Sequence, residues 1–342
     1  MRRVGILLLL VAACGGSEEV TQQPATATST PTATQPVDSA PVDVAVDVDV
    51  AVADPPACTP WTWQKHGAAL SPPSSTAQND GFLSPAVAER QGTIHLWFAS
   101  KVGLTYRLQH ASSTDGVTFT APEPLTGLRE AEIVAYPAVL VDGGKFRLWY
   151  GSGSFDYAES DDGVHFTNIA ERVFTAGATG SFDAMAVLYP AVVNTPAGLV
   201  LYYTGFNGQA YAIGRAIIGQ TIDRAPAAAV ITVGKASDFD NKAVAQTAAV
   251  IEDGEHLAWY GAYDTRKTNP GPYRIGFAKS ADGIAWQKQG IAIDLDPAGH
   301  DAYSARDPAV LRREKDWLMI YVGFAKDRRY RLLRATSEIC AR

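Results

Sequence analysis

The feature that most constrains the fold is a pattern that recurs five times between residues 84 and 323. Each copy has a Pro-Ala-Val step, a turn and a strand that ends in aromatic residues. The steps lie 52, 53, 57 and 61 residues apart, at Pro85, Pro137, Pro190, Thr247 (which replaces the proline) and Pro308. A repeat of this length, made only of short strands, is typical of propeller blades with four strands each. The sequence therefore predicts an all-β fold, a five-bladed β-propeller.

Three copies also carry an Asp-Gly turn that precedes an aromatic residue, at Asp115-Gly116, Asp162-Gly163 and Asp282-Gly283. Two-residue hairpins favour Asp-Gly because such turns need a positive φ. We place these turns in the outer hairpins of the blades, on the outer rim, and expect their role to be structural.

The N-terminus has the pattern of an export signal. Two arginines precede an apolar stretch at residues 4–13, which would reach about 15 Å as a helix and is too short to span a bilayer. The stretch ends in Val-Ala-Ala-Cys-Gly, and this resembles the lipobox of bacterial lipoproteins. The resemblance implies that residues 1–14 are a signal peptide and that Cys14 carries the lipid. An ordinary signal peptide with a chance cysteine is the alternative.

Residues 15–57 contain a Thr/Pro/Ala/Gln tract and then an Asp/Val alternation. Flanking prolines, the lack of aromatic residues and uniform negative charge favour a disordered, extended tether over a strand. Calcium binding by this acidic run is disfavoured, because it lacks the glycine and terminal glutamate of an EF-hand loop. We therefore expect a lipid-anchored protein of the bacterial cell envelope, in the outer membrane or at the cell surface, with its propeller at residues 58–342.

The two ends of this propeller region match each other. Residues 63–70 begin with Trp-Gln-Lys, as do residues 286–293, which the repeat places in an outermost strand. The N-terminal copy lacks inner strands, so we expect it to complete the blade formed by residues 307–337, a velcro closure that leaves no open edge. In an oxidising compartment, a disulfide between Cys58 and Cys340 would join the same two ends.

The charge distribution excludes one class of partner and the motifs exclude several chemistries. From Lys65 onward the chain has 27 basic and 29 acidic residues, so a basic surface for nucleic acid is not expected. The chain lacks a phosphate-binding loop, a dinucleotide fingerprint, a Gly-x-Ser-x-Gly motif and cysteine pairs with zinc spacing. We expect a monomer that binds no cofactor and no metal ion.

Candidate functional residues precede the Pro-Ala-Val steps, because the inner strands of a propeller begin at a shared central funnel. Immediately before the steps are Ser84, Tyr136, Tyr189, Gln246 and Asp307. An acidic residue lies seven positions before four of the steps, with another near the first, at Glu130, Asp183, Asp240, Asp301 and Asp80. Glu132 and Arg306 extend the set. Carboxylates with aromatic rings suit carbohydrates, because acids bind hydroxyl groups and flat rings stack on sugars.

The recurring pattern resembles the five-bladed propellers of arabinanases, levansucrases and invertases, which form glycoside hydrolase families 32, 43 and 68, with the family-130 phosphorylases nearby. The Asp307-Pro308 step, the Ser-x-Asp-Gly turns and the Phe-Asp spacing before the prolines carry this resemblance, over about residues 58–342. It implies a protein that acts on or binds carbohydrate.

The chain departs from these families at their catalytic positions. The resemblance implies an aspartate where this chain has Ser84, and a further aspartate and a glutamate where it has Tyr136 and Tyr189. Hydrolysis would need substitutes for these catalytic residues, with Asp307 as base and Glu132 or Asp183 as acid. The two carboxyl groups would have to lie about 5 Å apart for a retaining enzyme, or about 6.5–9.5 Å apart for an inverting one.

Purely structural roles for the same residues stay open. The repeated aspartates can cap loops by accepting backbone N–H bonds, and the two tyrosines can be core between blades. The sequence leaves three functions open, which are glycoside hydrolysis or transfer, non-catalytic glycan binding, and a protein scaffold. The residues expected to bind the sugar are Tyr136, Tyr189, Arg306, Asp240, Asp301, Asp80 and Gln246.

Overall fold

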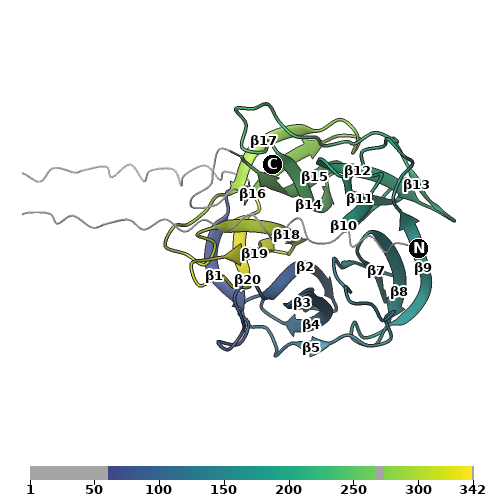
Figure 1. Ribbon diagram of the computed structural model, residues 1–342. Coiled ribbons are helices and arrows are strands. Elements are labelled where there is room, and N and C mark those ends of the chain that lie inside the picture. The colour runs from purple at the N-terminus through teal and green to yellow at the C-terminus, as the bar shows by residue number, and fades with distance from the viewer. Residues whose placement is uncertain (1–60, 266–272, 341–342) are drawn as a thin grey trace, which may run out of the picture. The chain divides into compact units, whose positions relative to one another are not determined.

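The computed structural model describes residues 61–265 and 273–340, within a compact unit that spans residues 56–342. The described residues form twenty strands and no helix, so the expectation of an all-β fold is confirmed (Figure 1). Accordingly, no described helix is long and apolar enough to cross a membrane. The signal segment, the tether and Cys58 lie outside the described residues.

The strands form antiparallel groups that follow one another along the chain, and we call each group by its first strand. The β2 group contains β2 (Gly81–Arg90), β3 (Thr93–Val102), β4 (Thr105–Ser113) and β5 (Glu123–Pro124). The β6 group contains β6 (Ala138–Asp142), β7 (Lys145–Tyr150), β8 (Ser154–Ser160) and β9 (Thr167–Thr175). The β10 group contains β10 (Ala186–Thr195), β11 (Gly198–Phe206), β12 (Tyr211–Ile218) and β13 (Ile222–Arg224).

Two further groups complete the described strands. The β14 group contains β14 (Ala243–Glu252), β15 (Glu255–Tyr263), β16 (Tyr273–Ser280) and β17 (Gln287–Ile293). The β18 group contains β18 (Ser304–Arg312), β19 (Asp316–Phe324) and β20 (Tyr330–Glu338), and its fourth strand is β1 (Gln64–Leu70), which pairs antiparallel with β20.

The first strands of the groups contact one another in a closed series. Strand β2 contacts β6 and β18, and β10 contacts β6 and β14, while β14 also contacts β18. Figure 1 shows β2, β10, β14 and β18 nearest a common centre, with the later strands of each group farther out. The beginnings of the first strands are thereby brought together, although they come from distant parts of the sequence.

A bulge interrupts the first strand at the repeated step in four of the five groups, while β6 begins only at Ala138, after its step. The register shifts between Leu83 and Ala86 in β2, and equivalent shifts occur in β10, β14 and β18. Proline cannot donate a ladder hydrogen bond, and this favours a bulge at the step. In every group the residue before the step has a φ between 49° and 60°.

Aromatic residues within the second strands form the core between groups. Trp97, Tyr202, Trp259 and Tyr321 are each 1% exposed or less. Polar atoms of these rings also contact the next group, since Trp97 Nε1 donates to the carbonyl of Gly163 at 2.7 Å and Tyr202 Oη to that of Gly283 at 3.3 Å.

The Asp-Gly turns lie between the third and fourth strands, as in an outer hairpin, and their glycines have φ values of 70°, 85° and 70°. In each turn the aspartate accepts two backbone N–H bonds, as Asp115 does from Val117 and Thr118 at 2.7 and 2.9 Å. These bonds lower the pKa of Asp115 to about 2. The glycines are buried against the preceding group, so the turns also join one group to the next.

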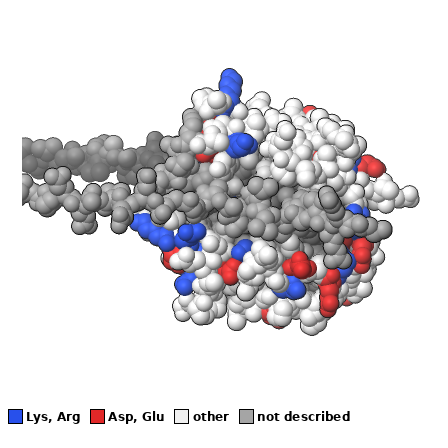
Figure 2. Space-filling view, viewed as in Figure 1, with Lys and Arg blue, Asp and Glu red and all other residues white. Residues whose placement is uncertain are grey.

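Charged side chains on the described surface are mixed in sign. Figure 2 shows basic and acidic side chains interspersed among uncharged ones on one face. This distribution agrees with the near balance of 27 basic and 29 acidic residues after the tether.

Candidate functional site

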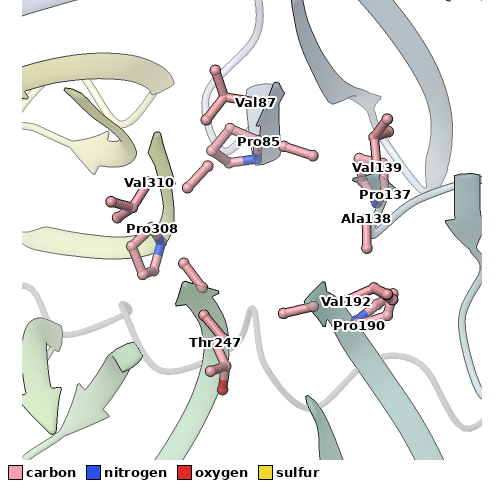
Figure 3. A pocket seen from close by; sticks show the side chains of 15 residues that line it. Pro85, Val87, Pro137, Ala138, Val139, Pro190, Val192, Thr247, Pro308 and Val310 are labelled. Atoms are coloured by element: carbon pink, nitrogen blue, oxygen red, sulfur yellow. The ribbon is translucent and has the colours of Figure 1, made fainter. Parts of the chain in front are cut away.

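Six residues directly before the repeated steps form what we call the central cluster. They are Ser84, Tyr136, Tyr189, Gln246, Arg306 and Asp307. The segments that follow them line one shallow cavity of about 80 Å³. Figure 3 shows Pro85, Pro137, Pro190, Thr247 and Pro308 arranged around this hollow. The structure therefore brings together the residues that precede the five repeated steps.

Direct contacts link most members of the central cluster. The backbone N–H and the hydroxyl of Ser84 both donate to Oδ2 of Asp307, at 3.1 and 3.2 Å. The rings of Tyr136 and Tyr189 lie 4.1 Å apart between centroids, and Gln246 Nε2 donates to Tyr189 Oη at 3.4 Å. The cluster thus joins side chains whose positions span more than two hundred residues of sequence, as the 223 residues between Ser84 and Asp307 show.

Asp307 is the acid of this cluster and is 3% exposed. Burial raises its pKa above the ordinary value, while Arg306 and the hydrogen bonds from Ser84 oppose that rise only in part. No carboxylate is among the groups that shift this pKa. Asp307 is therefore a buried acid that holds its proton more tightly than an exposed aspartate does.

Arg306 is 7% exposed and lies between two aromatic faces. Its guanidinium carbon is 5.6 Å from the centroid of Tyr273 and 5.0 Å from that of Tyr330. Arg306 Nε is 3.8 Å from Asp307 Oδ1, an ion pair that is too long for a hydrogen bond. Among the described residues, Arg306 Nε, Asp307 Oδ1 and Gln246 Oε1 are buried without a hydrogen-bond partner.

Tyrosines at the beginnings of the third strands are a part of the site that sequence reasoning missed. Tyr211, Tyr273 and Tyr330 are the first residues of β12, β16 and β20, and Tyr106 is the second of β4. Burial raises the pKa of Tyr106 to about 12, and Arg306 and Asp307 are among the groups that act on it. The available signal was an aromatic pair across the preceding hairpin, as in Phe324 and Tyr330.

The repeated aspartates lie in separate buried networks. Asp183 accepts from Tyr203 at 3.0 Å and pairs with Arg224 at 2.6 Å. Asp240 likewise accepts a hydrogen bond from Tyr260 and forms an ion pair with Lys288. Asp301 accepts a hydrogen bond from Tyr321 and forms an ion pair with Lys65. In all three the tyrosine lies 20 residues after the aspartate.

Asp80 pairs with Lys101 at 2.8 Å and also accepts the N–H of Gly103. The partners of the repeated aspartates are thus mainly side chains, where loop capping by backbone N–H groups was the expected structural role. This geometry gives Asp80, Asp183, Asp240 and Asp301 structural partners within their own groups or in a neighbouring one.

Glu132 lies on an exposed loop before β6. Its backbone carbonyl accepts the N–H of Tyr106 at 3.0 Å. The structure places Asp307, Asp183 and Glu132 in different local environments, in which Asp307 contacts Ser84, Asp183 contacts Tyr203 and Arg224, and Glu132 contacts Tyr106. Within residues 61–265 and 273–340, no group of three or more histidine, cysteine or acidic side chains is arranged to hold a metal ion.

Comparison with known sequences gives two curated relatives. These are the uncharacterized proteins MT1551 and Rv1502 of Mycobacterium tuberculosis (strains CDC 1551 and H37Rv), each 29% identical over 175 residues. The match covers 49% of this chain and 58% of each relative, so the chain spans little more than half the length of the relatives. No family model matches the chain.

Comparison with solved structures gives glycoside hydrolases. One glycoside hydrolase has a TM-score of 0.67 at 13% identity, with 81% of this chain and 92% of that chain covered. A thermostable family-43 glycoside hydrolase gives 0.59 at 14% identity, with 77% and 90% covered. The catalytic domain of a family-62 α-L-arabinofuranosidase from Coprinopsis cinerea gives 0.61 at 14% identity, with 83% and 100% covered. The chain therefore has the β-propeller fold of these glycoside hydrolases.

Proposed function

We propose that this protein binds carbohydrate in the central cluster. The observation that carries the proposal is a set of buried polar atoms without partners, on Gln246, Arg306 and Asp307, in a cluster that also contains Tyr136 and Tyr189 and directly precedes the segments that line the cavity. Buried polar groups in proteins are nearly always hydrogen-bonded. A sugar supplies both hydroxyl donors and acceptors at close spacing, and its C–H faces stack on aromatic rings such as Tyr136 and Tyr189.

The geometry favours binding over hydrolysis. Glycoside hydrolysis uses two carboxyl groups about 5 Å apart for retention or about 6.5–9.5 Å apart for inversion. Asp307 is the acid among the five residues that precede the steps, and the other four are serine, tyrosine, tyrosine and glutamine. The candidate partner Asp183 is engaged by Arg224 and Tyr203. A binding protein needs no second carboxylate.

Hydrolysis stays the second candidate because of one observation. Burial raises the pKa of Asp307, and a general acid must hold its proton at the working pH. In this alternative Asp307 protonates the leaving oxygen, which reverses the role of base expected for it as a substitute for the family's catalytic residues. Its partner would be Glu132, whose side chain is exposed.

The two candidates are separated by measuring affinity and turnover on the same oligosaccharide panel. We expect calorimetric binding, no release of sugar, and weakened binding in Gln246→Ala and Asp307→Asn. A matched control is Gln289→Ala, which removes an exposed side chain from β17. Turnover that Asp307→Asn abolishes would establish hydrolysis instead, and a panel without binding or turnover would refute both.

We also propose that the five strand groups are the blades of a five-bladed propeller, closed by the N-terminal strand. The support is the pairing of β1 with β20 together with the Lys65–Asp301 ion pair, which repeats the Lys288–Asp240 pair of the preceding group. Cys340 is disulfide-bonded, and pairing with Cys58 would fasten the same closure.

Surface anchoring through Cys14 completes the proposal. It rests on the lipobox-like sequence alone, so its test is independent of the propeller. We expect metabolic labelling with a fatty acid in a bacterial host, and loss of the label in Cys14→Ser but not in Cys58→Ser. Unlabelled wild-type protein would contradict the anchor.

A further inference from the structure

Arg306 is the cation of the central cluster, and its Nε is buried without a hydrogen-bond partner among the described residues. We propose that it binds the carboxylate of an acidic sugar, so that the central cluster selects uronate-containing glycans. This inference rests on the proposed carbohydrate binding and adds the chemical class of the ligand.

The first argument is the unfilled hydrogen-bonding capacity of Arg306. A guanidinium has five N–H donors and no acceptor. The Arg306 side chain is 8% exposed, and its Nε is buried without a hydrogen-bond partner among the described residues. A buried cation without hydrogen bonds is costly to the fold. An anionic ligand that accepts several of these donors removes that cost.

The second argument is that Asp307 does not satisfy Arg306. Its Oδ2 is taken by two hydrogen bonds from Ser84. The other oxygen, Oδ1, is 3.8 Å from Arg306 Nε and makes no hydrogen bond. Because burial also favours the protonated form of Asp307, this acid opposes an incoming anion less than an exposed aspartate does.

The third argument is orientation. Tyr273 and Tyr330 lie against the guanidinium of Arg306, and contacts of this kind hold the group in place. A positioned guanidinium presents parallel N–H groups in a fork that matches the two oxygens of a carboxylate. A neutral hydroxyl accepts from fewer donors and leaves the rest of the fork unfilled.

The surrounding charge agrees with an anionic ligand. The hairpin that connects β19 to β20 ends beside Tyr330 and carries Lys326, Asp327, Arg328 and Arg329, and Arg331 follows at the start of β20. Asp327 is paired with Arg331, and the five residues together carry an excess of positive charge. The basic hairpin would attract acidic glycans toward the cluster.

The test compares each uronate oligosaccharide with its carboxyl-reduced counterpart, which has the same linkage and a CH₂OH group in place of the carboxylate. With galacturonate, glucuronate and mannuronate oligomers and the full chain, we expect at least one acidic oligomer to bind about tenfold or more tighter than its reduced form. A sulfated neutral oligomer separates a carboxylate from a sulfate as the anion that is recognised.

The variants assign the preference to Arg306. Arg306→Gln is expected to bind acidic and reduced oligomers equally, and Arg306→Lys, which keeps the charge but loses the fork, to retain part of the preference. Arg312→Gln is the matched control, because this arginine lies at the far end of β18 and pairs with Glu252. Thermal unfolding confirms that each variant is folded, and Arg306→Lys carries the test if Arg306→Gln is not.

The outcomes separate this inference from the proposed function. Equal affinity for acidic and reduced oligomers, or a preference that survives in Arg306→Gln, would refute the role of Arg306 while carbohydrate binding stands. A preference for the sulfated oligomer alone would overturn the uronate assignment. Failure of acidic, reduced, sulfated and neutral glycans alike to bind would refute the proposed function as well.

Discussion

The residues of the central cluster adopt a backbone conformation that side chains rarely tolerate. Ser84, Tyr136, Tyr189, Gln246 and Asp307 have positive φ values, which cost a residue with a Cβ about 1–2 kcal/mol. Such strain persists only where the surrounding structure imposes it, and it is concentrated at functional sites. Here these residues lie directly before the repeated steps, at a bulge in four of the five groups, and their side chains meet in the central cluster.

The raised pKa of Asp307 predicts how stability depends on pH. The folded protein keeps this proton at pH values where the unfolded chain, with an ordinary pKa of about 4, has lost it. The free energy of unfolding should therefore fall as the pH rises from about 4 through the raised pKa. In Asp307→Asn this fall should be absent, as measured by melting temperatures between about pH 4 and 8.

Asp282→Asn is the control for that titration. Backbone N–H bonds lower the pKa of Asp282 to about 2, below the range of the measurement. This variant should melt at a lower temperature, because its turn is weakened, but keep the pH dependence of the wild type. An unchanged pH dependence in Asp307→Asn would show that Asp307 does not titrate in this range.

At the scale of elements, the Asp-Gly turns and the Pro-Ala-Val steps follow local rules and were readable from the sequence. A turn needs a positive φ at one residue, and a proline removes one ladder donor. The cationic partners of the repeated aspartates were not readable, whereas their tyrosine partners keep a fixed spacing of 20 residues. Arg224 lies 41 residues after Asp183 and Lys288 lies 48 residues after Asp240, in loops and strands of different length. Pairing over such distances depends on how groups meet in space.

The site, too, contains residues that the sequence predicted and residues that it did not. The residues before the steps were found because the repeat marks their position. The tyrosines of the third strands were missed, although Tyr106 and Tyr211 both lie 21 residues after their steps and Tyr330 lies 22 residues after its own. Tyr273 departs from this spacing, at 26 residues, because the connection between β15 and β16 is longer.

The contact between a turn and the preceding group predicts a difference between two glycines. A Cβ on Gly283 would lie 2.2 Å from Tyr202 Oη and 2.9 Å from His256, at a φ of 70°. A Cβ on Gly92, at a φ of 75°, would meet nothing within 4 Å. Gly92→Ala should lower the free energy of unfolding by about 1 kcal/mol, from backbone strain alone. Gly283→Ala should lower it by about 1–3 kcal/mol more.

Urea titration of both variants gives these free energies. If the free energy of unfolding fell equally in the two variants, Tyr202 would move aside without cost, and the turn would not join the two groups tightly.

At the scale of the whole molecule, the first and last strands depend on each other. Lys65 on β1 pairs with Asp301, whose side chain is 2% exposed. Lys65→Met would leave this carboxylate with Tyr321 and a backbone N–H as partners. We expect the free energy of unfolding to fall by about 1–3 kcal/mol, less than for a fully buried pair because the lysine is 28% exposed.

Lys145→Met is the matched control for Lys65. Its ion pair with Glu159 is 3.6 Å long and its side chain is 50% exposed, so the loss should be below about 0.5 kcal/mol. Chemical denaturation of the two variants side by side makes the comparison. If Lys65→Met is as stable as Lys145→Met, β1 does not depend on this ion pair.

The pairing of β1 with β20 also has a consequence for biosynthesis. His66 and its hydrogen-bonded neighbour Thr336 are separated by 270 residues. At a translation rate of about 5–20 residues per second, β1 leaves the ribosome roughly a quarter of a minute to a minute before its partner exists. During that time its edge is exposed to other nascent chains, and unpaired edges invite aggregation. Production in the cell should thus depend on chaperones that shield the early strand until the last one arrives.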